Sequence, residues 1–385
     1  MNKALKYAPK VARKAISQTR RDIADWKHAL QIASAVKNPK PWALMEIYSD
    51  IVNDALMSSQ INNRIEQTIS APFELINKAG KIDTAATDTF RHIPCIIDLM
   101  KYIWESEWYG CSLVELSITG GSLGVSLIDR RNVDPVFGRF YPDITFDNYI
   151  PYRDVSEYGK WLIEFNGEHI GNLNKLVPHA LFKKFAQSCW SELCEIFGIP
   201  PRYIKTNTQD AAMLDRAESM MRDMGAASWF IIDTTEEFQF AQGVNTNGDV
   251  YANLIALCNN EISMMVSGAV IGQDTKNGNE SKEKISVEML NRLTDSDKRL
   301  IEMYMNTAVI PALYRVGFIP SGELTFRFSA AENTEKLWQY TAALLPFKQV
   351  DNDFISEKFG VPVADAAVPS ADLSFLSEEE RRFFV

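Results

Sequence analysis

The side chains that could perform covalent or metal chemistry are few and scattered along the chain. The sequence contains five cysteines and four histidines. Cys189 and Cys194 are five positions apart, which does not match the two-residue gap of a zinc knuckle, and no two histidines show the His-x3-His spacing of a helical metal site. An odd, dispersed set of cysteines is typical of reduced thiols that pack as small apolar side chains. The sequence therefore predicts no metal ion and no cofactor.

Motifs for nucleophilic or nucleotide chemistry do not occur in the sequence either. There is no serine nucleophile elbow, no Walker lysine and no GxGxxG, and Gly120-Gly121 precedes a predicted strand where a nucleotide-binding loop would need a helix. Asp143, Asp147 and Asp154 are carboxylates that could serve a nuclease or hydrolase, but they fit turn positions equally well. The sequence therefore disfavours an enzyme.

A polar segment from Gly272 to Lys284 is the other place where chemistry could occur. It contains two glycines, two asparagines and no apolar residue, so it cannot form a core of its own. Such a segment is normally a solvent-exposed connection. Alternatively, Lys276, Lys282 and Lys284 could contact phosphate groups transiently, because the acidic residues between them keep the attraction weak. The residues alone leave both interpretations open.

The length and the net charge of the chain limit the class of protein that it can be. A chain of 385 residues predicts two or three cores, and no apolar run reaches the roughly 18 residues of a membrane-spanning helix. The net charge of −10 counts against a sequence-specific DNA-binding protein, since lysines and arginines supply most of the affinity for phosphates. The same charge is compatible with a channel whose acidic wall repels phosphates, and equally with a protein that the charge merely keeps soluble.

Hydrophobic periodicity predicts helices first and then a β-rich module of about 60 residues. Alternation around Gly120-Gly121 indicates a hairpin, and Gly110 should end the helix before it. The predicted elements of this half are a basic arm at 1–22, helices at 42–70 and 88–109, and strands at 112–119, 123–128, 137–141 and 160–165.

In the second half, two helices bracket a small α/β insert, and a helix of about 30 residues follows the polar segment. Pro311 should kink this long helix, and Glu288–Arg292 and Asp295–Arg299 should pair along it. The predicted elements are helices at 177–197, 210–224, 249–267, 281–314, 333–348 and 351–359, and strands at 202–205, 229–233, 237–241 and 323–328. A loose tail rich in alanine, proline and serine ends the chain.

The apolar faces of these helices predict which side chains are buried. On 177–197 they include Leu181 and Phe185, and on 333–348 they include Tyr340 and Leu344. On 249–267, one face carries Leu254, Leu257, Cys258, Ile262, Met265 and Val266, and Glu261 interrupts it. Met213, Met220, Met221 and Met224 lie along the predicted helix of the insert. We expect these methionines to pack against the sheet, and this interpretation is favoured over a docking face for other proteins.

Three sequence segments, in the order in which they occur along the chain, resemble the Mu-type branch of phage portal proteins. They are the join Phe197–Tyr203 (FGIPPRY), the helix Tyr251–Gly268 with NNEIS at 259–263, and the loop Gly272–Ser281 (GQDTKNGNES). The run Tyr48–Arg64, with Asp50, Asp54 and Arg64, also resembles the family's opening helix. From the residues themselves, we expect these charges to form surface or helix pairs. The resemblance extends over roughly two thirds of the chain.

The resemblance implies an α+β, portal-like ring subunit with long stem and spoke helices, a β-rich wing and a small α/β clip. The implied divisions are a basic arm and helical part of the wing (1–110), the β-rich wing (111–175), the first stem helix (176–199), the clip (200–247), the second stem helix (248–271), the tunnel loop (272–284), a long kinked wing helix with a strand (285–332), and crown-like helices with a loose tail (333–385).

The resemblance also implies a function without an active site. Copies of the chain, twelve in the family's usual ring, would form a channel at one capsid vertex through which double-stranded DNA passes without sequence specificity. The implied partners are a terminase, the major capsid or scaffold protein and a head–tail adaptor, with no membrane. The protein would be made in the host cytoplasm and incorporated into the virion. The alternative is another ring-forming head–tail connector or adaptor, and a nuclease or hydrolase is disfavoured.

Site residues follow from the resemblance in three groups. The DNA-facing tunnel loop would use Lys276, Asn277, Asn279, Lys282 and Lys284; the stem contacts between subunits would use Leu254, Leu257, Glu261 and Met265; and the clip would use Arg202, Tyr203, Met213, Met220 and Trp229. In a ring, neighbouring copies would complete the small sheet of the clip, because an α/β unit of this size buries too little surface to be stable alone.

Overall fold

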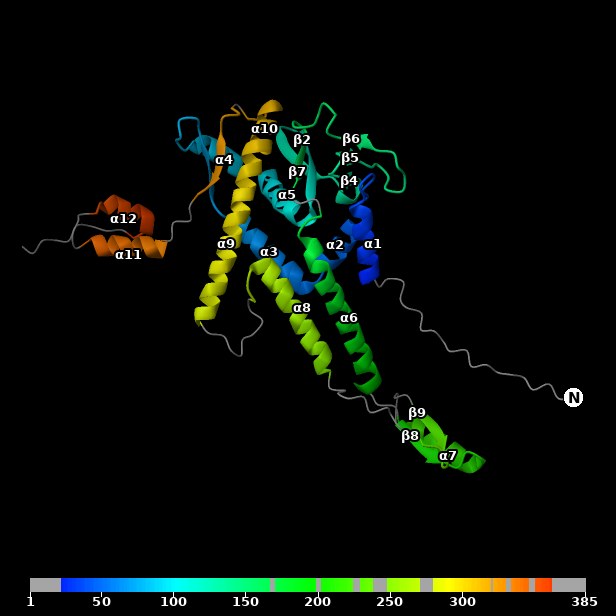
Figure 1. Cartoon of the computed structure of the whole chain (residues 1–385). Helices are drawn as coiled ribbons and strands as arrows, with labels where there is room; N and C mark the ends of the chain where they lie inside the picture. Colours follow the sequence, from blue (N-terminus) through cyan, green and yellow to red (C-terminus); the bar gives the residue numbers. More distant parts are fainter. Residues whose placement is uncertain are drawn as a thin grey trace, which may run out of the picture. The chain divides into compact units, whose positions relative to one another are not determined.

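The computed structural model divides the chain into two compact units, Met1–Phe328 and Ser329–Val385 (Figure 1). Helices predominate and the sheets are small, so the predicted mixture of helices and strands is confirmed. The structure describes residues 22–166, 170–198, 202–223, 229–237, 248–270, 280–319, 321–329, 334–345 and 350–361. The basic arm, apart from Asp22, and the tail after Val361 lie outside these residues.

Two helices, α2 (Trp42–Val52) and α3 (Ala55–Ile69), replace the single helix predicted at 42–70. The break lies at Asp54, whose backbone is extended and whose carboxylate accepts a hydrogen bond from the backbone N–H of Met57. This side chain caps α3, because the first N–H groups of a helix have no partner within it. The helix before them is α1 (Ile23–Ala33).

The helix predicted at 88–109 is also two helices, α4 (Thr84–Arg91) and α5 (Cys95–Tyr109). The break precedes Pro94, because proline disfavours helical backbone at the residue before it and donates no hydrogen bond. The predicted end at Gly110 is confirmed by its left-handed backbone, with φ at 96°.

After Gly110 the predicted hairpin is confirmed. β2 (Cys111–Thr119) pairs with β3 (Ser122–Leu127) on one side and β7 (Leu162–Asn166) on the other, in an antiparallel sheet ordered β3–β2–β7. Val114 and Phe165 are fully buried in the core between this sheet, α5 and the end of the long helix α9 (Glu280–Tyr304). A second small sheet comprises β4 (Val133–Asp134), β5 (Arg139–Phe140) and β6 (Ile150–Pro151), after the short 3-10 helix η1 (Arg130–Asn132).

Two helices, α6 (Leu173–Gly198) and α8 (Asp249–Ser267), lie side by side (Figure 1). α8 has the predicted bounds, and α6 begins four residues before the predicted start. Between them in sequence, β8 (Arg202–Thr206) and β9 (Trp229–Asp233) form a parallel pair connected through α7 (Ala211–Asp223). Of the strand predicted at 237–241, Glu237 is in no strand and the rest lies outside the described residues.

The long helix α9 (Glu280–Tyr304) continues into a π-helical turn (Met305–Val309) and then α10 (Ile310–Arg315). Pro311 occupies the first turn of α10, where a missing N–H costs little, and the irregular turn comes just before it. The helix is therefore irregular just before Pro311, and the predicted kink stays a prediction. β10 (Thr325–Phe328) then pairs with β1 (Phe73–Ile76), a strand that the sequence analysis did not predict.

The second unit contains α11 (Thr334–Leu344) and α12 (Asn352–Phe359), and the rings of Trp338 and Phe359 lie 5.2 Å apart, edge to face. The burial predicted for Tyr340 and Leu344 is wrong, because these side chains are 68% and 52% exposed. Two short helices provide too little surface to cover an apolar face.

Candidate nucleic-acid interface

The predicted DNA-facing loop connects the end of α8 to the beginning of α9. Lys276, Asn277 and Asn279 lie outside the described residues, as does the side chain of Lys282. Lys284 is exposed near the start of α9. α8 ends at Ser267, where Gly268 adopts a left-handed backbone with φ at 73°. What the described residues establish is therefore how the two helices that flank this loop are held.

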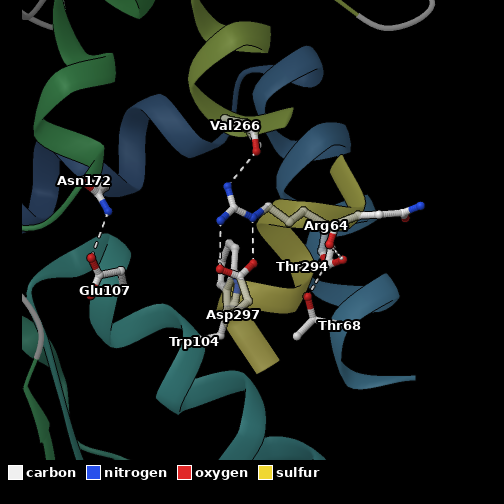
Figure 2. A network of polar contacts seen from close by, with 9 residues as sticks. Arg64, Thr68, Trp104, Glu107, Asn172, Val266, Thr294 and Asp297 are labelled. Atoms are coloured by element: carbon white, nitrogen blue, oxygen red, sulfur yellow. Dashed lines mark hydrogen bonds and ion pairs between the residues drawn. The ribbon is translucent and has the colours of Figure 1, made fainter. Parts of the chain in front are cut away.

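A buried ion pair joins α3 to α9 (Figure 2). Arg64 Nε and Nη2 donate to the two carboxylate oxygens of Asp297 at 2.7 and 2.8 Å, and the two side chains are only 9% and 10% exposed. The indole N–H of Trp104 on α5 donates to the same carboxylate at 2.8 Å. Bidentate pairing with an additional donor gives Asp297 the hydrogen bonds that a buried carboxylate requires.

The same guanidinium also contacts α8. Arg64 Nη1 donates to the backbone carbonyl of Val266 at 2.8 Å (Figure 2). The guanidinium also lies 5.4 Å from the ring centre of Trp108. Val266 is the penultimate residue of α8. One side chain of α3 therefore binds both helices that flank the predicted loop.

A cavity of about 530 Å³ opens beside this ion pair. Its lining includes Arg64, Trp108, Met265, Asp297 and Arg299.

The predicted pair between Asp295 and Arg299 is wrong, because Asp295 accepts a hydrogen bond from Lys298 instead, at 3.2 Å. The predicted pair between Glu288 and Arg292 is confirmed at 2.8 Å.

The residues predicted for contacts between subunits differ in exposure along α8. Leu254 and Met265 are half-buried, whereas Glu261 is exposed and Leu257 is 55% exposed. The expectation that Leu257 shares the face of Cys258, Ile262 and Val266 is wrong, since only the latter three are buried. The cause is geometric, because residues seven apart lie almost in line on a helix. Leu257 thus falls in a separate exposed row with Val250 and Met264, which are 64% and 53% exposed.

On α6 the buried face differs from the prediction in the same way. Phe185 is 47% exposed, whereas Ala180, Lys183 and Ala186 are buried. Small alanines let α8 approach closely, and Lys183 is paired with Asp54 at 2.8 Å, with both side chains less than a tenth exposed. Asp54 thus caps α3 and also neutralises a buried lysine of α6.

The residues predicted for the clip lie on the small βαβ module. Tyr203 is 45% exposed and stacks on Phe230, and Trp229 is half-buried at the start of β9. The prediction that the methionines of α7 pack against the sheet is largely wrong. Met213 and Met220 are 53% and 50% exposed, and only Met221 of the described methionines of α7 is buried. A two-stranded sheet is too narrow to cover more. The side chain of Arg202 and all of Met224 lie outside the described residues.

The carboxylates considered for an enzyme have turn and surface roles. Asp143 accepts hydrogen bonds from the backbone and hydroxyl of Thr145, and Asp147 pairs with Lys40 at 2.5 Å. These contacts lower the pKa of both carboxyl groups, so neither resembles the raised-pKa acid of a hydrolase. No group of His, Cys, Asp and Glu with metal-binding geometry occurs among the described residues.

The thiols follow the pattern expected of reduced cysteines. Burial raises the pKa of Cys95 to about 11 and that of Cys111 to about 12, whereas Cys194 is exposed. Because the thiolate is the reactive form, we expect a disulfide reagent at pH 8 to modify Cys194 at least roughly 100-fold faster than Cys95 or Cys111. Mass mapping of the modified protein would measure this, with all five thiols reacting in denaturant. Early modification of Cys111 would contradict the buried position of β2.

Residues 45–361 match the family described as the portal protein of Mu bacteriophage. This match extends over most of the chain. The chain belongs to the Mu-type portal protein family. No curated protein shows a significant match to this portal protein. None of the helices in its described part combines the length and the apolar character that crossing a membrane requires.

Two solved structures are similar to this portal protein in fold. A chain from the neck of an empty GTA particle is 14% identical, with a TM-score of 0.52 over 89% of this chain and 100% of that one. An HK97-family phage portal protein from Corynebacterium diphtheriae is 11% identical, with a TM-score of 0.39 over 79% of this chain and 98% of that one. At these identities the first likeness concerns the fold alone.

Most of the residues that hold the flanking helices do not stand out in the sequence. Asp54 and Arg64 were expected to form surface or helix pairs, and both do form ion pairs, but these are buried and join α3 to helices that are distant in sequence. Asp297, Lys183 and Trp104 were not singled out. The available signal was a charged residue at a position that the surrounding apolar pattern assigns to a buried face.

Proposed function

We propose that this portal protein assembles as a closed ring at one capsid vertex and that DNA passes through the centre of the ring during packaging and ejection. The observation that carries the proposal is the exposed apolar row Val250, Leu257 and Met264 on α8. A row of large apolar side chains on one helix is costly in water, and a second copy of the chain would cover it. A head-to-tail interface that closes into a ring covers this row in every copy.

The proposed ring contains roughly twelve copies. The divisions expected for stem, clip, wing, tunnel loop and crown belong to this proposal. In it, α6 and α8 form the stem, the βαβ module joins neighbouring copies, and the connection between α8 and α9 faces DNA. The net charge of −10 supports a wall that repels phosphates, so that DNA slides without a preferred register.

The proposed partners are a terminase, the major capsid or scaffold protein and a head–tail adaptor, and the proposed location is the virion, after synthesis in the host cytoplasm. The chain acts in this proposal as a structural conduit and not as an enzyme. A ring elsewhere in the head–tail connector is the alternative, because one structure of similar fold comes from a particle neck.

Native mass spectrometry combined with electron microscopy tests the proposal. A 43.6 kDa chain in roughly twelve copies gives a particle of about 0.5 MDa, with an axial opening wide enough for a duplex. Immunogold labelling of procapsids that lack tails should find the protein at one vertex. A subunit that stays single at high concentration would remove the ring, and labelling confined to tailed particles would favour the connector.

Deleting Asn277–Glu280 should leave the rings intact and reduce the DNA retained in particles. The reason is that this segment is polar, cannot contribute a core, and is assigned the contact with DNA. The measurement compares ring mass with packaged DNA, quantified by nuclease protection. A control deletion of the same length in the tail after Val361 should leave DNA retention unchanged. Loss of ring assembly by the Asn277–Glu280 deletion would show instead that the segment is an interface.

A further inference from the structure

Polar side chains of α3 contact each of the long helices α6, α8 and α9. Asp54, at the N-cap, pairs with Lys183 of α6. One turn and a half further on, Gln60 donates to Ser263 of α8 at 2.8 Å and accepts from Ser267 at 3.3 Å. The remaining contacts are those of Arg64 with Asp297 and Val266, and of Gln67 with Asn291 of α9 at 2.7 Å.

Such contacts act differently from apolar packing. The hydrophobic effect has no direction, so apolar faces tolerate small sliding movements, whereas hydrogen bonds lose strength steeply with distance and angle. Polar groups in buried joints are best attested as devices that fix the register of helices. The polar residues of α3 are therefore suited to fix where each long helix stands along its axis.

Arg64 has the central place, because it binds α8 and α9 at once. Its contact on α8 is Val266, immediately before the end of that helix, and its contact on α9 is Asp297, fixed additionally by Trp104 (Figure 2). A side-chain carbon added to Gly268 would lie 3.1 Å from Leu293 of α9, so the two helices also approach closely here. A shift of α9 by one residue, about 1.5 Å, would break the bidentate pair with Asp297, and the same shift of α8 would break the hydrogen bond to Val266.

We propose that Arg64 is a positioning residue that fixes the axial register of α9 against the end of α8. In doing so it fixes the end of α8 relative to α9, the two helices that the connection joins in sequence. This inference rests on the proposed function only in taking that connection as the part that meets DNA. The register itself is a property of the single chain.

Two variants separate positioning from simple stability. Arg64→Lys keeps the charge but cannot form two parallel hydrogen bonds to Asp297 while also reaching Val266. The double variant Arg64→Met, Asp297→Leu replaces the pair with apolar groups of similar size, so that neither charge is left buried without its partner. Asp295→Asn with Lys298→Gln is the matched control, because it removes an ion pair whose two residues both belong to α9.

The measurement is the distance between spin labels at Asn260→Cys on α8 and Val287→Cys on α9, both exposed positions. Cys189→Ser and Cys194→Ser provide a background without accessible thiols. Labelled chains are diluted with unlabelled ones, so that double electron–electron resonance measures only distances between two labels in the same chain. We expect a narrow distribution for the parent and the control. Both Arg64 variants should show a shift or broadening of at least about 1.5 Å while the subunit stays folded.

An unchanged narrow distribution in folded Arg64→Lys protein would overturn the proposal, whether or not the double variant folds. If only the melting temperature falls and the distances stay the same, Arg64 is structural and does not set the register. Failure of the proposed function has a different signature. The parent would then form no ring or retain no DNA, while its distance between α8 and α9 could still be measured and would still respond to Arg64.

Discussion

Replacing Leu257 with aspartate should prevent the proposed ring from forming and leave single, folded subunits. Leu257 is 55% exposed in the chain, so the charge is tolerated there in water. In a ring, the carboxylate would enter an apolar contact, losing the burial of leucine and adding the desolvation of a charge. Even about 3 kcal/mol at each interface lowers the association constant more than roughly 100-fold. The same penalty recurs at every contact around the ring, so assembly should be lost.

Sizing by native mass spectrometry, together with thermal unfolding of the separated subunit, measures both halves of this expectation. Val36→Asp is the matched control, because Val36 is 88% exposed and lies outside the apolar row of α8. It should leave the ring unchanged. Rings of normal yield from Leu257→Asp would exclude α8 from the interface, and an unfolded subunit would show that Leu257 belongs to the core of the chain.

The local pattern of the sequence was sufficient for most helices and strands. α8 has the bounds that its apolar spacing and the following Gly268 predict, and the hairpin around Gly120-Gly121 is where alternation places it. The errors are breaks within long helical patterns. Asp54 and Pro94 each begin a new helix without interrupting the apolar periodicity, so a periodic pattern alone joins the two pieces. A cap or a proline inside a pattern is the signal that identifies such breaks.

Burial was harder to predict than secondary structure. Phe185 and Tyr340 lie on predicted helices and were expected to be buried, yet both are exposed in the chain. Leu257 was expected to share one face with Cys258, Ile262 and Val266, yet it is exposed while those three residues are buried. An apolar spacing says that a face is apolar, but it does not say whether the same chain or another copy covers it. Predictions of burial therefore fail most readily on helices of a subunit that assembles with others.

The buried ion pairs that hold the helices of the candidate site could not be predicted, for a different reason. Arg64 and Asp297 are separated by 233 positions, and Lys183 and Asp54 by 129. Nothing in the local pattern says which charge meets which. Only the packing of α3 against the long helices brings them together, and that packing depends on the complete fold.

Gly171→Ala should prevent the subunit from folding. Gly171 lies where the chain passes the end of α5 immediately before α6, and its φ is 77°. A Cβ atom there would lie 2.3 Å from the carbonyl oxygen of Trp108 and 2.6 Å from the backbone nitrogen of Gly110. These are backbone atoms that cannot rotate away, and the next residue is fixed by a hydrogen bond from Asn172 N–H to the carbonyl of Glu107. We expect a loss above about 4 kcal/mol.

Gly80→Ala isolates the cause of this loss. Gly80 has nearly the same φ, 74°, but a Cβ atom there would have no neighbour within 4 Å. It should therefore show only the cost of a left-handed alanine, about 1–2 kcal/mol, and a melting temperature lower by a few degrees. Soluble yield and thermal unfolding of the two variants measure the difference. Equal losses would mean that the backbone conformation, and not the close approach of α5 to the start of α6, decides the effect at Gly171.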